Sequence, residues 1–384
     1  MKKQLSFALT LGTSVLLAAC GGGSDNTATT TKPTITANIA VPNSATPPFS
    51  FDISYADSGK YFLADRNNKA VDVVDTKSNT LIGQITGTGA SAFTGFNSNT
   101  DLAGPDGLVG IPGTSTLYAG DVNSIKIINI STQQVVGTIA VPPINATLSP
   151  HRVDEGCYDP DDSLVMFSSP GETPPTATFI STKTNAIVAT YKFTTSSGLE
   201  ACVYDSKSTN FIVNNDGTPT NPAGEVNVIP ASSVVANAPE VVQVFPLGTC
   251  GPTGLTLGPN NDMLVGCDSP AGNPLITLIL DRTTGAKLAS IPFGGVDQVA
   301  YDSVSNRYFL PARHETASGV AASSGFTPVL GIIDASSRTL IDTLAMGTGV
   351  HSVAVDGASG QAYVPFQPGV AAFPNGGILV VTTH

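Results

Sequence analysis

The sequence lacks the short motifs by which many enzymes can be identified. It contains no GxSxG nucleophile elbow, no Walker phosphate loop, no HExxH zinc motif, and no CxxC or CxxCH redox or haem motif. The common nucleophile, phosphate-binding, zinc-protease and redox sites are therefore not indicated. A catalytic triad assembled from distant residues would leave no such trace. The sequence leaves open whether the protein is an enzyme, and it identifies no catalytic residue.

Charged residues, tryptophan and long apolar runs are also scarce. Charged residues make up 12% of the chain, tryptophan is absent, and the formal net charge is −12. This acidic balance argues against nucleic acid and anionic lipid surfaces as partners. After residue 19 no apolar stretch reaches about eighteen residues, so no further membrane span is expected. The 39 glycines and 28 prolines indicate many short strands joined by tight turns, and not helices.

The first twenty residues read MKKQLSFALTLGTSVLLAAC, a basic start and an apolar run that are typical of an export signal at residues 1–19. The run ends in Leu-Ala-Ala-Cys, which resembles the lipobox of bacterial lipoproteins, where cleavage before the cysteine frees it to receive a lipid, here on Cys20. The alternative is an ordinary signal peptide in which the cysteine stands by chance. The glycine- and threonine-rich residues 20–33 favour a lipoprotein, because an anchored domain needs a flexible tether.

Gly21, and not an aspartate, follows Cys20, which resembles the pattern for outer-membrane sorting in lipoproteins of diderm bacteria. We therefore expect a protein of the bacterial cell envelope, lipid-anchored to the outer membrane and facing the periplasm or the cell surface. The lipid would be its contact with the membrane. Its partner would be a small ligand or an envelope protein.

Four further cysteines follow, and an even number in an oxidising compartment predicts disulfides. Cys250 and Cys267 flank the hairpin sequence GPTGLTLGPNNDMLVG and would meet at its open end, so we expect them to pair. Cys157 and Cys202 are then left for each other on neighbouring repeats. Zinc binding is less favoured, because no two of these cysteines have the close spacing of a zinc knuckle.

The chain repeats a unit of four strands. Each unit has an apolar strand, a short polar turn, a second strand, a variable loop, a third strand, a Ser/Thr/Asn-rich turn and a fourth strand, as in FDISYADSGKYFLADRNNKAVDVVDTKSNTLIGQI. Fourth strands are expected to begin at Leu81, Val135, Ile187, Val241, Leu288 and Leu340. A period of about 50 residues with four strands per unit predicts the blades of a β-propeller.

Seven first strands can be counted, namely FDISYAD, DGLVGI, DEGCYD, EACVYD, TGLTLG, DQVAYD and HSVAVD. The seventh unit stops after its third strand, GGILVVTTH, whereas residues 34–41 (TITANIAV) form a lone strand after the tether. If that strand completes the last blade, no open sheet edge is left. The sequence thus predicts an all-β fold at residues 34–384: a seven-bladed β-propeller of four-stranded blades, its ring closed by the N-terminal strand.

The unit form HSVAVDGASGQAYV resembles the YVTN-type propellers of exported bacterial proteins and, more loosely, the gluconolactonase and strictosidine-synthase group. The resemblance covers residues 34–384 and implies a fold more than a function. Turns between first and second strands are short and uniform, so the face that carries them is expected to have a structural role and no binding site. The longer loops should meet at the other face, around the mouth of the central channel, where binding is expected.

Acids and histidines gather where the first strands begin at this mouth. The aligned residues there are Phe51, Asp106, Asp154, Glu200, Thr253, Asp297 and His351, and five of the seven are acids or histidine, although the whole chain has 29 acids and 4 histidines. The candidate ligand-binding residues are these five together with their neighbours on the same face: His151, Asp154, Glu155, Glu200, Asp297, His351, Asp106 and His314. The alternative is that acids merely begin strands after turns and are solvated there.

A ring of carboxylates in a confined mouth would share protons or hold a divalent cation, either Ca²⁺ or, if histidines join, a transition metal. We expect Asp154, Glu200 and Asp297 to be its ligands. Asp216 and the two asparagines before it offer further oxygen donors, but such residues are also ordinary turn formers.

Two functions remain open. In the first, a lipid-anchored propeller outside the cytoplasm binds a ligand or a protein partner on the loop-bearing face. In the second, the protein is a metal-dependent hydrolase similar to the lactonase and esterase group, in which a cation polarises a carbonyl and His151 or His351 moves the proton. The ring does not reproduce the Glu, Asn and Asp ligand order of gluconolactonases, which favours binding. Arg152 and Arg313 would pair with nearby acids or hold an anionic group of a ligand.

Overall fold

The computed structural model describes residues 32–384 except residue 47 and residues 145–149. The expected signal peptide at 1–19, Cys20 and most of the tether at 20–33 lie outside these residues. Residues 32–384 form one compact unit. Within the described part of the chain, no helix has the length and apolar character needed to cross a membrane.

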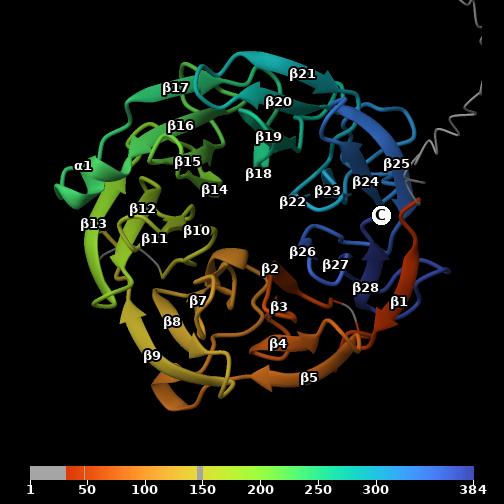
Figure 1. The fold of residues 1–384 in the computed structure, drawn as a ribbon, viewed down its shortest axis with the longest axis horizontal. Helices are drawn as coiled ribbons and strands as arrows, with labels where there is room; N and C mark the ends of the chain where they lie inside the picture. The colour runs from red at the N-terminus through yellow and green to blue at the C-terminus, as the bar shows by residue number, and fades with distance from the viewer. Residues whose placement is uncertain (1–31, 47, 145–149) are drawn as a thin grey trace, which may run out of the picture. The chain divides into compact units, whose positions relative to one another are not determined.

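The described chain forms seven four-stranded antiparallel sheets arranged in a ring around a central channel (Figure 1). In each blade the first strand lies next to the channel and the fourth lies at the rim. Blade 1 contains β2 (Phe51–Asp57), β3 (Lys60–Asp65), β4 (Ala70–Asp75) and β5 (Thr80–Ile85); blade 2 contains β6 (Leu108–Gly110), β7 (Thr116–Asp121), β8 (Ser124–Asn129) and β9 (Gln134–Ala140). Blade 3 contains β10 (Gly156–Asp159), β11 (Leu164–Ser169), β12 (Thr176–Ser181) and β13 (Ala186–Lys192); blade 4 contains β14 (Leu199–Asp205), β15 (Asn210–Asn215), β16 (Glu225–Pro230) and β17 (Gln243–Pro246).

The remaining blades follow the same order. Blade 5 contains β18 (Pro252–Leu257), β19 (Asp262–Cys267), β20 (Thr277–Asp281) and β21 (Lys287–Ile291); blade 6 contains β22 (Ala300–Asp302), β23 (Arg307–Ala312), β24 (Val329–Asp334) and β25 (Thr339–Ala345). Blade 7 contains β26 (Ala354–Asp356), β27 (Gln361–Phe366), β28 (Gly377–Thr382) and, at the rim, β1 (Ile35–Ile39). The short helices η1 (Gly89–Ser91), η2 (Thr100–Leu102) and α1 (Ala231–Val235) lie in connections. The prediction of an all-β, seven-bladed propeller is confirmed.

The ring closes where the N-terminal strand joins the last blade. β1 pairs antiparallel with β28, and Ile39 stands opposite Ile378. Both side chains are buried in a cluster that also includes Phe49 and Phe51 of blade 1. The closing strand thus completes blade 7 and contributes to its packing on blade 1, as the lone strand at residues 34–41 predicts.

Apolar side chains pack between neighbouring blades. The described residues contain seven hydrophobic clusters, and each joins two adjacent blades. Second and third strands are buried on both faces, which explains their continuous apolar runs. Between blades 3 and 4, for example, the rings of Phe179 and Phe211 lie 5.1 Å apart. Truncating such a buried phenylalanine to alanine would cost about 3–5 kcal/mol.

Aspartates at strand ends hold the tight turns between strands. Asp159, at the end of β10, accepts the backbone N–H groups of Asp161 at 2.8 Å and Asp162 at 3.2 Å. Asp75, at the end of β4, accepts the N–H of Ser78 at 2.8 Å. A short carboxylate side chain replaces a backbone acceptor in this kind of turn. Asp159 and Asp75, which precede polar turns in the sequence, therefore have a structural role.

Both disulfide predictions are confirmed. Cys157 of β10 pairs with Cys202 of β14, with Cα atoms 5.6 Å apart, and links blades 3 and 4. Cys250 pairs with Cys267 within blade 5, with Cα atoms 4.9 Å apart. The first bridge therefore joins two neighbouring inner strands, and the second closes one hairpin.

Candidate functional site

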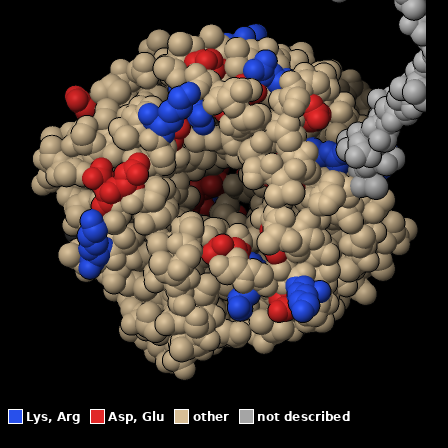
Figure 2. All heavy atoms as spheres, viewed as in Figure 1, with Lys and Arg blue, Asp and Glu red and all other residues tan. Residues whose placement is uncertain are grey.

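Charged side chains are concentrated at the end of the channel where the first strands begin. Figure 2 shows acidic atoms inside the central opening of the ring. Ten residues there influence one another electrostatically and form what we call the channel site. They are Asp52, Asp106, Asp154, Glu155, Glu200, Asp216, Asp297, Arg66, Arg152 and Arg313. Acids outnumber arginines in this set, so the site carries excess negative charge when its carboxyls are ionised.

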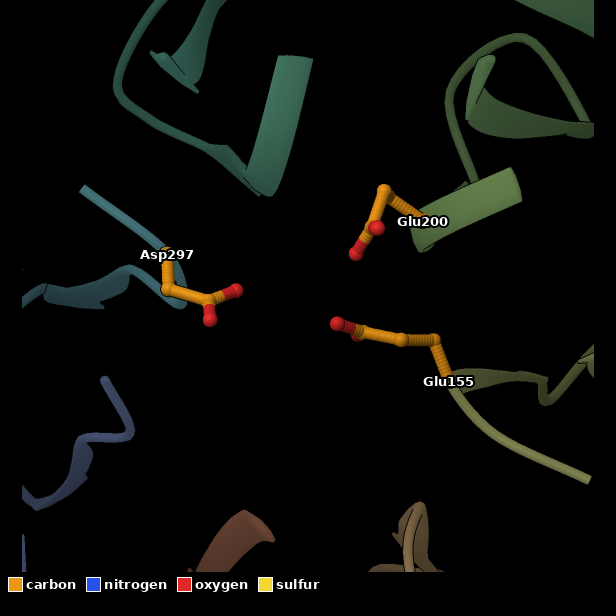
Figure 3. A group of neighbouring side chains, drawn as sticks. All are labelled: Glu155, Glu200 and Asp297. Carbon is orange, nitrogen blue, oxygen red and sulfur yellow. The ribbon is translucent and has the colours of Figure 1, made fainter. Parts of the chain in front are cut away.

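Three carboxylates of the channel site converge on one point. One oxygen from each of Glu155, Glu200 and Asp297 lies within 4.8 Å of the other two, and Figure 3 shows the side chains extending toward one another from separate parts of the ring. Glu155 precedes β10, Glu200 lies in β14 and Asp297 precedes β22, so blades 3, 4 and 6 supply one each. Glu155 and Asp297 are 5% and 8% exposed. We call these three residues the carboxylate trio.

Burial changes the proton affinity of these groups. Burial, and after it the charges of neighbouring carboxylates, raises the pKa of Glu155 and of Glu200 well above the ordinary value. Burial also raises the pKa of Asp154 to about 6, although the charge of Arg152 opposes this. Burial thus favours the protonated form of both glutamates, and a bound cation would oppose that effect.

The structure places Glu155 in the trio, where the sequence led us to expect Asp154. The Asp154 carboxylate faces Arg152 instead, with Oδ2 2.9 Å from Nη2. Successive residues of an extended chain point to opposite sides, so Asp154 and Glu155 do not face the same point. The structure therefore groups Glu155, and not Asp154, with Glu200 and Asp297, and a role for Asp154 as a metal ligand stays a prediction. On Asp297, Oδ2 lies 2.6 Å from Nη1 of Arg313, so both arginines that the sequence singles out pair with acids.

Asp106 lies in a second part of the channel site. The guanidinium of Arg66 bridges the carboxylates of Asp52 and Asp106, which come from blades 1 and 2. All three side chains are buried. Burial raises the pKa of Asp106 well above the ordinary value, against the opposing charge of Arg66. Burial acts in the same direction on Asp52, but Arg66 and other cations outweigh it and lower the Asp52 pKa. Asp106 thus has a structural partner, and its role in ligand binding stays a prediction.

His351 lies beside the channel site but does not belong to the trio. Its ring stacks on Phe51 with the centroids 4.5 Å apart, and Nδ1 lies 2.6 Å from the carbonyl oxygen of Gly349. Burial, and after it the charge of Arg313, lowers the His351 pKa. A neutral, stacked imidazole at this position supports the packing of blades 7 and 1.

The other two candidate histidines lie in separate surroundings. His151 is buried, and its Nδ1 lies 3.5 Å from Oε1 of Glu172. His314 Nδ1 lies 2.7 Å from Oδ2 of Asp268. Among the residues that the structure describes, the group of three or more potential metal ligands contains no imidazole. The structure thus places five of the eight candidate residues in the channel site, brings three of them together as the trio, and leaves the histidines outside the trio.

Asp52 is a channel residue that the sequence alignment misses. The alignment assigns Phe51 to this position of blade 1. Counting five residues back from the aspartate that ends the inner strand gives Glu200 from Asp205 and gives Asp52 from Asp57. The inner strand of blade 1 has an irregular register between Phe51 and Ser54, which obscures the match at the strand start.

Arg66 and Gln298 were also not singled out by the sequence. Arg66 follows the second strand of blade 1 directly, as Arg313 follows that of blade 6, so the repeat contains a weak signal for it. The Gln298 side-chain amide donates a hydrogen bond to Oε1 of Glu155. No sequence pattern indicates that contact, because it joins blades 6 and 3 across the channel.

The trio is suited to a hard cation. Calcium takes oxygen ligands at about 2.3–2.6 Å, so two of its ligands can lie up to about 5 Å apart. The separation of 4.8 Å or less within the trio fits that limit. Since the trio supplies oxygen atoms and no imidazole, its donor set favours calcium over a transition metal.

Comparison with known proteins shows the fold. No protein-family model and no curated protein matches the chain. A hydrazine synthase chain from Kuenenia stuttgartiensis is similar in structure, with a TM-score of 0.65 and 14% identity over 86% of this chain and 94% of that one. The Pan2 WD40 domain from Neurospora crassa gives a TM-score of 0.62 and 9% identity over 91% and 95%. U3-55K gives a TM-score of 0.62 and 10% identity over 88% and 96%. At these identities the likeness identifies a β-propeller and assigns no activity.

Proposed function

We propose that this protein is a lipid-anchored β-propeller outside the cytoplasm, which binds a ligand or protein partner at the loop-bearing end of its channel through a divalent cation. The observation that carries the proposal is the convergence of Glu155, Glu200 and Asp297 within 4.8 Å. The location is supported by the lipobox-like sequence at Cys20 and by the resemblance to YVTN-type exported propellers. A propeller fold is compatible with binding either a ligand or a protein.

Charge balance supports a divalent ion. When ionised, the trio carries three negative charges, and Arg313 offsets one of them at Asp297. A divalent cation would neutralise the remaining two. Without it, burial raises the pKa of both glutamates and so favours their protonated forms. The trio therefore has two alternative occupants, protons and a cation.

The cation would leave room for a ligand. Calcium takes six to eight oxygen ligands, and the trio supplies fewer. When bound, the ion can accept further oxygen atoms from water or from a carboxylate or hydroxyl group of a ligand. The partner chemistry that this site favours is therefore an oxygen-rich group, presented either by a small molecule or by an acidic loop of an envelope protein.

Thermal unfolding with added calcium tests the site. A cation that binds the folded protein stabilises it by about 2.7 kcal/mol at one hundred times its dissociation constant. We expect calcium to raise the unfolding temperature of the wild type and to have little effect on Glu200→Gln. Equal effects on both proteins would contradict a role for the trio.

Metabolic labelling tests the anchor. We expect the wild type to incorporate labelled palmitate and to sediment with membranes. Cys20→Ser should remain unlabelled and lose that association. The test is specific for Cys20, because the other four cysteines form the two disulfides and have no free thiol to receive lipid. A wild-type protein that takes up no lipid would contradict the proposed anchor.

A metal-dependent lactonase or esterase is the second candidate. It is favoured by carboxyl groups that titrate close to neutrality beside the trio, because Asp154 and Asp216 both have a pKa of about 6 and a proton-transferring group works best near the operating pH. A bound cation would polarise a carbonyl oxygen. A screen of lactones and esters with the wild type and Glu200→Gln distinguishes this candidate, since simple binding predicts no turnover by either protein.

A further inference from the structure

A cavity of about 610 Å³ lies at the end of the ring opposite to the channel site. Its rim includes Pro112 and Pro160, which lie in the turns between first and second strands of blades 2 and 3, and its wall includes Tyr55, Tyr158 and Tyr204. The sequence predicts a face with a structural role and no binding site here, because those turns are short and uniform. The cavity is a departure from that prediction, and we call it the tyrosine basin.

A glycine in blade 2 makes room for one of the tyrosines of the basin. Gly110 pairs with the second residue of β7, as Tyr158 pairs with the second residue of β11 and Tyr204 with that of β15. Gly110 thus stands where blades 3 and 4 have a tyrosine. A Cβ atom at Gly110 would lie 2.1 Å from the ring of Tyr55, so that ring occupies the space above the glycine. Three tyrosines from blades 1, 3 and 4 consequently line the basin, and blade 2 contributes no tyrosine to its wall.

The basin is electronegative. Of the described residues that line it, none is lysine, arginine or histidine. The Tyr204 hydroxyl donates a hydrogen bond to Oδ2 of Asp161 at 2.9 Å. Burial, and after it the charge of Asp57, raises the pKa of Tyr55, so a second carboxylate acts on the wall of the basin. Neutral tyrosine faces bearing partial negative charge, with carboxylates beside them, attract cations.

We propose that the tyrosine basin binds a ligand carrying an ammonium or quaternary ammonium group on an apolar body. The cationic group rests against the tyrosine faces, and the apolar part rests on the apolar wall, which includes Leu108, Val109 and Cys157. The basin shares no residue with the channel site, so this activity is independent of cation binding by the trio.

The test compares a charged probe with its neutral isostere. Binding of choline and of 3,3-dimethyl-1-butanol, in which carbon replaces the quaternary nitrogen, is measured by NMR titration of the full-length protein, with benzyltrimethylammonium as a larger cationic probe. Tyr158→Leu keeps the apolar bulk and removes the aromatic face. Tyr301→Leu is the matched control, because Tyr301 has the same place in blade 6 and does not line the basin.

The outcomes are separable. We expect the cationic probes to bind at least about fivefold more tightly than the neutral isostere, and Tyr158→Leu to lose about fivefold for cations while Tyr301→Leu stays within about twofold. Equal binding of choline and its isostere would overturn the proposal, as would no saturable binding of any probe. If Tyr158→Leu fails to fold, the selectivity of the wild type decides alone. Glu200→Gln should leave probe binding unchanged, which separates this result from failure of the channel site.

Discussion

Replacing Arg66 by methionine removes the positive charge that joins blades 1 and 2 inside the channel. The guanidinium bridges Asp52 and Asp106, and the three residues are 5%, 8% and 0% exposed. Methionine keeps much of the apolar stem of arginine but leaves two buried carboxylates without their partner. Removing one member of a buried ion pair costs about 3–5 kcal/mol, because the remaining charge stays desolvated.

The expected loss can be measured by thermal unfolding. The folded unit spans residues 32–384, and an unfolding entropy of about 2.1 cal/mol/K per residue converts 3–5 kcal/mol into a decrease of about 4–7 °C in Tm. The measurement is made by calorimetry near neutral pH in the presence of a chelator, so that cation binding does not contribute. Lys32→Met is the control, since the Lys32 side chain is 71% exposed and its ion pair with Asp342 is a surface pair, worth about 0–1 kcal/mol.

A double variant identifies the cause. Asp106→Asn in the Arg66→Met background removes one of the two uncompensated carboxylates and should restore at least about 1–2 kcal/mol of folding free energy. Cavity formation at Arg66 would not be relieved by that change. An Arg66→Met variant as stable as Lys32→Met, or one that Asp106→Asn destabilises further, would show that Arg66 does not stabilise the fold by pairing with these carboxylates.

Three further perturbations have expected outcomes. With chelator present, Glu200→Gln should be more stable than the wild type at about pH 8 and equally stable below about pH 4. Folding raises the pKa of the Glu200 carboxyl above its ordinary 4.5, so this group destabilises the fold as pH rises from its unfolded-state pKa to its folded-state pKa. Urea unfolding measures the difference, and a variant less stable than the wild type at about pH 8 would contradict this prediction. Replacing Cys157 and Cys202 by serine opens a loop of 45 residues and should lower the free energy of unfolding by about 4 kcal/mol. Guanidinium unfolding measures the change, and an unchanged midpoint would show that the disulfide does not stabilise the fold. Ile39→Asp should expose the amides of β28, its partner strand, to hydrogen exchange, and protection as in the wild type would argue against closure of the ring by β1.

The repeat made the fold predictable. A regular period fixes the number of blades, and a seventh unit short of one strand requires a partner for its edge. Most fourth strands begin within one residue of the expected place, as β5 does at Thr80 against Leu81. β17 is an exception, because it begins at Gln243 and not at Val241. The helix α1 (Ala231–Val235) lengthens the connection before it, and such an insertion has no counterpart in the repeat.

The candidate site was predictable in position but not in composition. The excess of acids at strand starts locates the channel mouth, yet the choice between Asp154 and Glu155 depends on which way one extended segment faces. His151 and His314 are placed by segments that differ from blade to blade, so the repeat carries no information on whether they meet the acids. His351 has the aligned position in blade 7, but its ring stacks on Phe51 and does not join the trio. The tyrosine basin depends on the absence of a side chain at Gly110, and a missing group leaves little trace in a sequence.

Calcium binding by Glu155, Glu200 and Asp297 can be measured by elemental analysis of the protein purified without chelator, followed by calcium titration of the metal-free form. We expect one calcium ion per chain in the wild type and none in Glu200→Gln. The control Glu240→Gln, where an exposed glutamate outside the channel is changed in the same way, should bind one ion. A wild type that takes up no calcium at about 1 mM, or a Glu200→Gln variant that binds as much as the wild type, would contradict calcium binding by the trio.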